Sequence, residues 1–542
     1  MKLRILLAML LLAALMAAVV VTCSPYAPVV APAPEDIQAI WDIEDAREQS
    51  DVPLVTALAN HGVPLAYDAQ ANRFYCTLGL GHEEAWPDIH LTAPGAEGVS
   101  LVFADDYSYD WCADAIRDGY AYQAMAYTDT AFSYFEIVFT GLPQLQIVTG
   151  GQEITQEDCA VRVLGSAYGE EPLDSTARAH LRGASTLIFD KKSIKLEFTR
   201  ERDGVSKKME RSVPGFGLTD EAALLPCWHD SIKMRDRLNW DLWAELAADD
   251  EPFGARRAQY VELFLDGAYW GVYLMVEPVD VKAELELAGE GRLMHDSVYR
   301  TAALNFSRDR EYVEHPYREN AGYELYYAPQ GAAPFAGLEG YLELVTQEDD
   351  EAFAQMALER IDVDSALRHL LFVQGCGLAD NVFNNMYIWA QTQGGKTTYR
   401  FSPWDLDLAW GFERESIGEE YENWMFFPVM DRMLRLDVGG VRQKACDMWQ
   451  EMRATIFNEA ALEERVAQYT YELGESGALM REAERWGTDM YYPDGYELIS
   501  FAAVRWPLLD EAIALLPEKM EIDYLTQSNY VSKGGSIWPS LE

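Results

Sequence analysis

Basic residues are scarce in this chain of 542 amino acids, and their scarcity excludes several classes of partner. Lysine and arginine number 43 against 89 aspartates and glutamates, which gives a formal net charge of −46 at pH 7. Electrostatic repulsion therefore opposes binding to nucleic acid or to anionic membrane surfaces. Two interpretations of the acidity stay open, namely solubility and the electrostatic capture of a basic substrate protein.

The chain also lacks the short motifs of several enzyme classes. Its eight histidines show no H-E-x-x-H spacing, and neither a G-x-S-x-G elbow nor a P-loop occurs. The cysteines are widely spaced with no C-x-x-C pair, so a zinc site is not expected. Asp405 and Asp407 are too close in sequence to be, by themselves, the opposed carboxylates of a glycosidase.

Long apolar runs are absent after the first residues. Lys2 and Arg4 precede an apolar run over residues 5–21, a pattern typical of an export signal. Cys23 follows where a bacterial lipoprotein is cut and lipidated, although Thr22 is larger than the residue preferred there. We expect an exported lipoprotein anchored at Cys23, with simple secretion and an uncleaved N-terminal anchor as alternatives.

Composition and local patterns divide the rest of the chain into predicted segments. An apolar content of 49% is ample for conventional cores, and the length predicts two or three domains. Strand-like runs suggest a small β-rich domain that begins with a helix over Glu35–His61. The predicted segments are 1–23 (signal), 24–34 (Pro- and Ala-rich tether), 35–141 (β-rich accessory domain), 142–526 (main domain, with a motif core over 142–411 and a helical tail over 412–526) and 527–542 (flexible end).

Two features of the accessory domain have alternative interpretations. Cys76 and Cys112 flank strand-like segments, so they would form a disulfide in an exported protein or remain as buried thiols. The cluster Asp105–Trp111 would bind calcium or sugar, or would form a turn with aromatic packing.

The most informative stretch is Gly377–Asn385, followed by Ser402–Asp407 after two predicted strands. Phosphoryl transfer needs a carboxylate to orient and deprotonate the acceptor hydroxyl, and an amide oxygen and a second acid to hold a divalent metal. Asp380, Asn385 and Asp405 supply these groups, with Asp380 and Asn385 in the D-x-x-x-x-N spacing of a protein-kinase catalytic loop. Asp407 alternates with Asp405, so either acid, or both, would bind metal. Asp and Asn also cluster in ordinary turns, which is the alternative interpretation.

Three further motifs precede this stretch in the sequence. They are Arg182–Thr186, Lys191–Phe198 and the hairpin Tyr260–Glu277 with its turn at Asp266-Gly267. Together with the loop and strand end above, they resemble the CotH family, the spore-coat protein H type of atypical kinase. The resemblance implies an α/β (α+β) two-lobed, protein-kinase-like fold with a helical C-terminal part. It also implies dependence on ATP and on Mg²⁺ or Mn²⁺.

The resemblance further implies a basic side chain directed at the nucleotide phosphates. Arg182 is one candidate, and Lys192 and Lys195 are two others that the sequence does not choose between, because strand alternation places them on opposite faces. Glu245, on a helix predicted over residues 230–248, would pair with that lysine. Glu277, just before Pro278, would lie where a kinase has its adenine-binding hinge.

The leading hypothesis is an exported ATP- and metal-dependent kinase that modifies Ser or Thr of a cell-surface or secreted protein, with Asp380 as the base. Its substrate would be basic and Ser-rich. One alternative is a CotH-like surface module that binds partners without catalysing transfer. Another is a carbohydrate-binding protein that uses the aromatic N-terminal domain.

Overall fold

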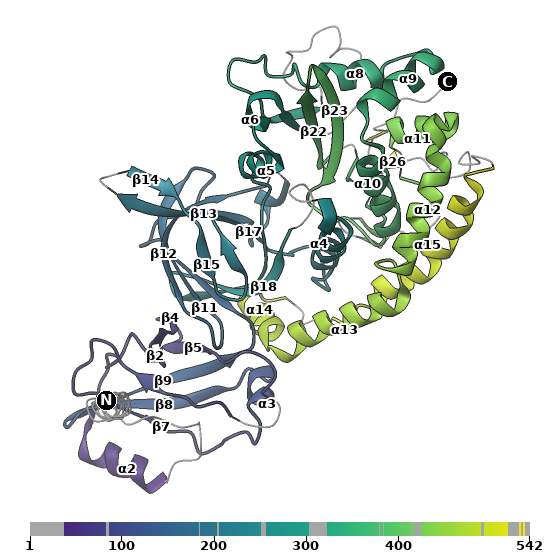
Figure 1. The fold of residues 1–542 in the computed structure, drawn as a ribbon. Coiled ribbons are helices and arrows are strands. Elements are labelled where there is room, and N and C mark those ends of the chain that lie inside the picture. Colours follow the sequence, from purple (N-terminus) through teal and green to yellow (C-terminus); the bar gives the residue numbers. More distant parts are fainter. Residues whose placement is uncertain are drawn as a thin grey trace, which may run out of the picture.

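The computed structural model describes most of the chain after the N-terminal segment. It covers residues 37–518, except 83–85, 184, 203–204, 251–255, 303–321, 379, 383, 414–415, 418–423, 426 and 489–492, together with 531–532 and 535–536. The predicted signal, the tether and Cys23 lie outside the described residues. Three parts follow one another along the chain: a β-rich N-terminal part, a barrel, and a C-terminal part of helices around a small sheet (Figure 1). This mixture agrees with the predicted α+β class.

The N-terminal part is built on a mixed sheet in which β9 is central, parallel to β5 and antiparallel to β8. Its core is aromatic and aliphatic, with Phe74, Phe135 and Ile137 buried. The helix predicted over Glu35–His61 is wrong beyond Ala46, because residues 48–49 pair with β9 and residues 59–60 join a smaller sheet. The elements are α2 (Ile37–Ala46), β1 (Glu48–Gln49), β2 (Ala59–Asn60), β3 (Val63–Pro64), β4 (Ala66–Asp68), β5 (Arg73–Thr77), β6 (Leu91–Thr92), β7 (Ser100–Phe103), α3 (Cys112–Arg117), β8 (Ala121–Tyr127) and β9 (Ala131–Thr140).

Cys76 and Cys112 are free thiols in this core, so the predicted disulfide is wrong and the buried-thiol alternative holds. Removal from water raises the pKa of each thiol to about 12. The Asp105 cluster is a turn with aromatic packing, because the carboxylate accepts hydrogen bonds from Tyr107 N at 3.0 Å, Tyr120 Oη at 3.0 Å and Gln123 N at 3.2 Å.

The second part is a closed barrel. Its strands follow the order β12-β11-β10-β18-β19-β17-β13, and β13 pairs back with β12 to close the ring. The interior is apolar, with Val163, Leu196 and Met275 fully buried. The strands are β10 (Gln144–Val148), β11 (Cys159–Ser166), β12 (Leu173–Leu181), β13 (Ile194–Arg202), β14 (Val205–Lys208), β15 (Arg211–Val213), β16 (Gly217–Thr219), β17 (Glu221–Leu225), β18 (Ala258–Leu265) and β19 (Ala268–Val276).

The predicted hairpin is confirmed as β18 and β19. Its turn residues Asp266 and Gly267 have φ values of 46° and 88°, the left-handed backbone that Asp and Gly tolerate in a tight hairpin turn. The Asp266 carboxylate accepts a hydrogen bond from Thr149 N at 2.7 Å. A Cβ at Gly267 would lie 2.1 Å from Tyr67 O, so the backbone of the turn packs closely against the N-terminal part.

The C-terminal part surrounds a sheet of order β21-β20-β22-β23, with α10 packed against β23. Its core is continuous with one side of the barrel, where Val272 and Leu274 join buried residues of α10 such as Leu370. The elements are α4 (Arg235–Leu246), α5 (Val281–Ala288), α6 (Arg292–His295), β20 (Ser297–Thr301), β21 (Tyr323–Tyr327), α8 (Glu339–Val345), α9 (Asp350–Arg360), α10 (Val363–Cys376), β22 (Met386–Gln393), β23 (Lys396–Pro403), β24 (Phe412–Glu413), β25 (Ser416–Ile417), α11 (Pro428–Leu436), α12 (Val441–Ala454), α13 (Glu459–Glu475), α14 (Ala478–Trp486), α15 (Tyr496–Leu515), β26 (Val531–Ser532) and β27 (Gly535–Ser536).

Helix α13 returns the chain from the C-terminal helices to the barrel (Figure 1). It starts at Asn458, whose side chain caps the helix by accepting hydrogen bonds from Ala460 N and Ala461 N. It contacts α3 of the N-terminal part, and α14 then packs against β19. Within the described residues, no helix combines the length and apolar character that crossing a membrane requires.

Candidate active site

The predicted catalytic loop follows α10 directly. That helix is capped by Asp362, whose side chain accepts from Ser365 N at 3.0 Å, and it ends at Gly377, where φ is 66°. The neutral ring of His369, on α10, donates from Nε2 to Asn381 O at 2.8 Å. Burial lowers the pKa of His369 to about 4, so the ring stays uncharged. The helix therefore fixes the loop through one buried hydrogen bond.

Asp380 and Asn385 are neighbours in this loop, as predicted. The side-chain amides of Asn384 and Asn385 both donate to Asp380 Oδ2, at 3.0 and 3.2 Å. Asn385 has a φ of 58°, in the left-handed region that Asn adopts more readily than most residues. Its carbonyl accepts from Trp404 N at 2.9 Å, which ties the loop to the end of β23. The two amides hold the Asp380 carboxylate in one orientation.

Asp405 and Asp407 follow the end of β23. The expectation that they alternate on one strand face is wrong, because β23 ends at Pro403 and Asp405 has a φ of 60°. The acids nevertheless interact electrostatically. Burial and the charges of Asp405 and Asp380 raise the pKa of Asp407 to about 8. Asn381 Nδ2 donates to Asp405 O at 3.2 Å, so the loop and the strand end are linked a second time.

A further acid, Asp236 on α4, was missed by the sequence interpretation. It is buried, and its Oδ1 accepts a hydrogen bond from Leu406 N at 3.2 Å. Burial and the charges of Asp407 and Asp405 raise its pKa well above the ordinary value. The only sequence signal was the polar character of the buried face of α4, since Asp236 and Asn239 lie three residues apart and therefore on one side of the helix.

Arg182 reaches the same region from the end of β12. Its guanidinium lies 4.9 Å from the centroid of the Trp404 ring, next in sequence to Asp405. Its Nη1 is buried and has no hydrogen-bond acceptor among the described residues. A buried guanidinium nitrogen without a partner is costly unless a ligand supplies the acceptor. Arg182 is thus a predicted site residue that the fold brings to Trp404, the residue before Asp405.

The two predicted lysines make other contacts. Lys192 donates from Nζ to Phe189 O at 2.8 Å, and Lys195 pairs with Glu221 at 2.8 Å on the barrel. The glutamates predicted for the nucleotide also pair elsewhere, Glu245 with an arginine of α13 at 2.5 Å and Glu277 with an arginine beside β18 at 2.9 Å. Each of these four side chains therefore has a partner outside the acid cluster.

The donor set suits a hard divalent cation only together with ligand oxygens. Within the described residues, no three His, Cys, Asp or Glu side chains lie close enough to hold a metal ion. Mg²⁺ commonly takes one or two carboxylates and completes its shell with phosphate oxygens and water. Asp405, Asp407 and the amide oxygen of Asn385 fit that role, and the raised pKa of Asp407 reflects negative charge that a cation would offset.

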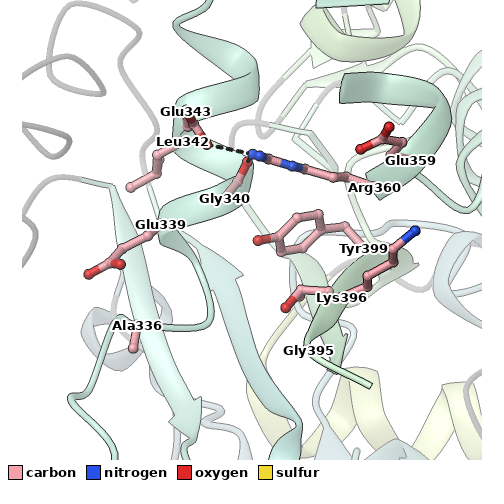
Figure 2. A pocket seen from close by; sticks show the side chains of 11 residues that line it. Ala336, Glu339, Gly340, Leu342, Glu343, Glu359, Arg360, Gly395, Lys396 and Tyr399 are labelled. Carbon is pink, nitrogen blue, oxygen red and sulfur yellow. Dashed lines mark hydrogen bonds and ion pairs between the residues drawn. The ribbon is translucent and has the colours of Figure 1, made fainter. Parts of the chain in front are cut away.

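A separate cavity of about 670 Å³ lies at the other end of the β22–β23 hairpin (Figure 2). Arg360 extends across it and donates to Glu343 at 2.7 Å. The lining residues are Ala336, Glu339, Gly340, Leu342, Glu343, Glu359, Arg360, Gly395, Lys396, Thr397 and Tyr399, and they include none of the predicted site residues. This cavity is distinct from the acid cluster.

Comparison with known families gives a match over this region. The family model described as CotH kinase protein matches residues 179–500, which is more than half of the chain. The chain belongs to the CotH family. The match extends from the end of β12, which Arg182 follows directly, through α4 and the Asp380 loop to the C-terminal helices, so it spans the whole candidate site of this CotH protein. Comparison with curated proteins gives no significant match.

Proposed function

We propose that this CotH protein is a protein kinase that transfers the γ-phosphate of ATP to Ser or Thr of a cell-surface or secreted protein. The observation that carries the proposal is the orientation of Asp380 by the two amide donors of Asn384 and Asn385, beside Asp405 and Asp407. A carboxylate fixed in this way suits a group that orients a hydroxyl and accepts its proton.

In the proposed reaction the hydroxyl oxygen of the substrate Ser or Thr forms a bond to the γ-phosphorus. The bond between that phosphorus and the β–γ bridging oxygen breaks, ADP leaves, and the hydroxyl proton passes to Asp380. Asn385 and Asp405, with Asp407, would hold Mg²⁺ or Mn²⁺, which when bound neutralises charge on the phosphates. Arg182 would donate from its buried Nη1 to a phosphate oxygen.

The proposed fold is a two-lobed kinase-like one, with the nucleotide between the barrel and the C-terminal helices. Arg182, which extends from the barrel toward Trp404 of the C-terminal part, supports that location. The substrate would be a basic, Ser-rich protein, because the net charge of −46 favours a positively charged partner. The proposal includes export and lipidation at Cys23. The protein would then contact the membrane only through this N-terminal anchor.

The experiment is transfer of label from γ-labelled and, in parallel, α-labelled ATP by the full chain with Mn²⁺, onto itself and onto a basic Ser-rich peptide. Asp380→Asn and Asp405→Asn are compared with Asp447→Asn, an exposed control on α12. Loss of γ-label in the first two variants alone supports the kinase. Transfer of α-label would mean nucleotidyl transfer. No transfer of either label, with no ATP-induced rise in melting temperature, would leave a non-catalytic surface module.

A further inference from the structure

A buried charge cluster joins the barrel to α14. Lys191 is fully buried, and its ammonium donates to Glu482 Oε2 at 2.7 Å, Pro226 O at 2.9 Å and Val272 O at 2.5 Å. An ammonium has three donors, so Lys191 has none left for a ligand. Burying this charge is tolerated because Glu482 and the two carbonyls replace water.

Lys233 shares the same glutamate but retains a donor. Its ammonium lies 2.9 Å from Glu482 Oε1 and donates to Cys227 O at 3.2 Å. These are its acceptors in the described part of the chain, so a third N–H can reach a ligand. The side chain is 13% exposed, whereas that of Lys191 is 0% exposed. Lys233 is therefore the lysine of the cluster that retains some exposure to solvent.

The position of Lys233 relative to the acids follows from the chain and from the charges. It lies just before α4, which carries Asp236. Asp236 and Lys233 both act electrostatically on the Cys227 thiol and shift its pKa in opposite directions, so both groups lie near that thiol. Asp230 acts on Lys233 and also on Asp407, which links the lysine to the acids after β23.

We propose that Lys233 contacts the phosphates of the nucleotide, and that Glu482 and Lys191 are positioning residues that hold its ammonium in place. The proposal rests on the proposed function and deepens it by assigning the phosphate-binding lysine. A nucleoside triphosphate would extend from the metal-binding acids toward this ammonium, which has a free N–H for one of its oxygens. Lys192 and Lys195 stay the rival assignments, since each ammonium has one printed contact, with Phe189 O and with Glu221 respectively.

Glu482 belongs to α14, so a helix of the C-terminal part would complete the nucleotide site. The same helix supplies Arg481, whose guanidinium pairs with Glu262 of β18 at 2.7 Å with both side chains buried. Glu482 Oε2 also accepts from Val272 N at 2.6 Å, next to Gly271. Lys191, Glu262 and Gly271 belong to the motifs Lys191–Phe198 and Tyr260–Glu277. In the structure all three lie against α14.

The test measures the affinity of the full chain for ATP and for adenosine, each with Mn²⁺, by calorimetry. Lys233→Met is expected to weaken ATP binding about tenfold, the loss of one charge-assisted contact, and to leave adenosine binding unchanged. Lys233→Arg is expected to retain most of the ATP affinity. Lys195→Met tests the rival assignment, and Lys444→Met, exposed on α12, is the matched control.

The variant Glu482→Gln distinguishes a positioning role of Glu482 from a purely structural one. We expect it to raise KM for ATP more than it lowers kcat, measured at a temperature where circular dichroism shows the variant folded. A lower melting temperature with an unchanged KM would mean that Glu482 is only structural. Equal ATP affinity in Lys233→Met and the wild type, or a loss confined to Lys195→Met, would overturn the assignment while the kinase stands. Failure of the wild type to bind ATP would overturn both proposals.

Discussion

Asn239 holds the backbone of Leu406, the residue between the two acids that follow β23. Its Nδ2 donates to Leu406 O at 2.7 Å, and its Oδ1 accepts from Trp410 Nε1 at 2.9 Å. Asp236, one turn earlier on α4, accepts from Leu406 N at 3.2 Å. Because both polar groups of this peptide are bound by one helix, α4 fixes the direction of Asp405 and Asp407.

Asn239→Leu is expected to lower kcat of the proposed transfer about tenfold or more, because the acids lose their support. Removing a buried hydrogen-bond partner should also reduce the free energy of unfolding by about 1–3 kcal/mol. Steady-state kinetics and urea denaturation measure the two effects. Asn458→Ala, which removes the cap of α13, is a control with a loss of about 1 kcal/mol that leaves the contacts of Asn239 in place. If both variants lose activity in proportion to stability, the specific role of Asn239 is refuted.

Asp380→Asn is expected to lower kcat about 10²- to 10⁴-fold and to leave KM for ATP nearly unchanged, because the amide cannot accept the hydroxyl proton. The melting temperature should change little, since Asp380 is only partly buried. Single-turnover kinetics with γ-labelled ATP measure the chemical step directly. A variant with wild-type kcat would remove Asp380 from the reaction.

Stability at acid pH should depend on His369. Its pKa is about 4 in the folded chain and about 6.5 in an unfolded one, because burial disfavours the imidazolium. Between these values only the unfolded state binds the proton, so the contribution of His369 is complete above pH 6.5 and is lost as the pH falls to 4. The full effect amounts to about 3 kcal/mol.

His369→Gln provides the comparison, because glutamine offers an N–H to Asn381 O and does not titrate. The free energy of unfolding is measured by urea denaturation from pH 4 to pH 8 for both proteins. The difference between their curves should change between pH 6.5 and 4 and stay flat above pH 7. A flat difference over the whole range would contradict the buried neutral imidazole.

Metal binding should become stronger as the pH rises from 6 to 9. The pKa of Asp407 is about 8, so in the absence of metal its contribution to stability is complete below pH 4 and is lost as the pH rises to 8. A cation binds the ionised form and releases the proton. Mn²⁺ at 100 times its Kd should stabilise the chain by about 2.7 kcal/mol.

Calorimetry of Mn²⁺ binding in two buffers with different ionisation enthalpies measures the released proton. Asp407→Asn should remove the proton release, and Asp405→Asn should weaken binding itself. Proton release that persists in Asp407→Asn would assign the titrating group elsewhere in the acid cluster.

Local sequence patterns predicted the parts of the site that are close in sequence. The spacing of Asp380 and Asn385 predicted a shared loop, and the two are hydrogen-bonded there. The Asp266-Gly267 dipeptide predicted the hairpin turn, because few other residues adopt positive φ values at both positions. Short-range geometry decides such features, so one segment contains all the information needed.

Contacts between distant segments could not be predicted in this way. Strand alternation separated Lys192 from Lys195, but it gave no reason to consider Lys191, whose counter-ion Glu482 lies 291 residues away in sequence. The place of Asp236 in the site could not be predicted for the same reason, because its partner, the backbone of Leu406, belongs to another segment. Without the fold, a buried charge cannot be distinguished from an exposed one by its neighbours in sequence.

Gly271 provides a test of the contact between α14 and the barrel. Its φ is 119°, and an added Cβ would lie 2.8 Å from Glu482 Oε2 and 3.1 Å from Lys191 Cε. Gly271→Ala therefore combines backbone strain with displacement of Glu482, and we expect a loss of stability of about 2–4 kcal/mol. Gly289→Ala is the control for strain, because Gly289 has a φ of 140° and no atom within 4 Å of the added Cβ.

A double-mutant cycle with Glu482→Ala separates the two contributions to this loss. If the alanine at position 271 acts by displacing Glu482, the two substitutions together should cost less than the sum of their separate costs, by at least about 0.5 kcal/mol. The same cycle with Gly289→Ala should be additive. Additive costs in both cycles, measured by urea denaturation, would mean that Gly271 is required for its backbone conformation alone and not for the approach of α14.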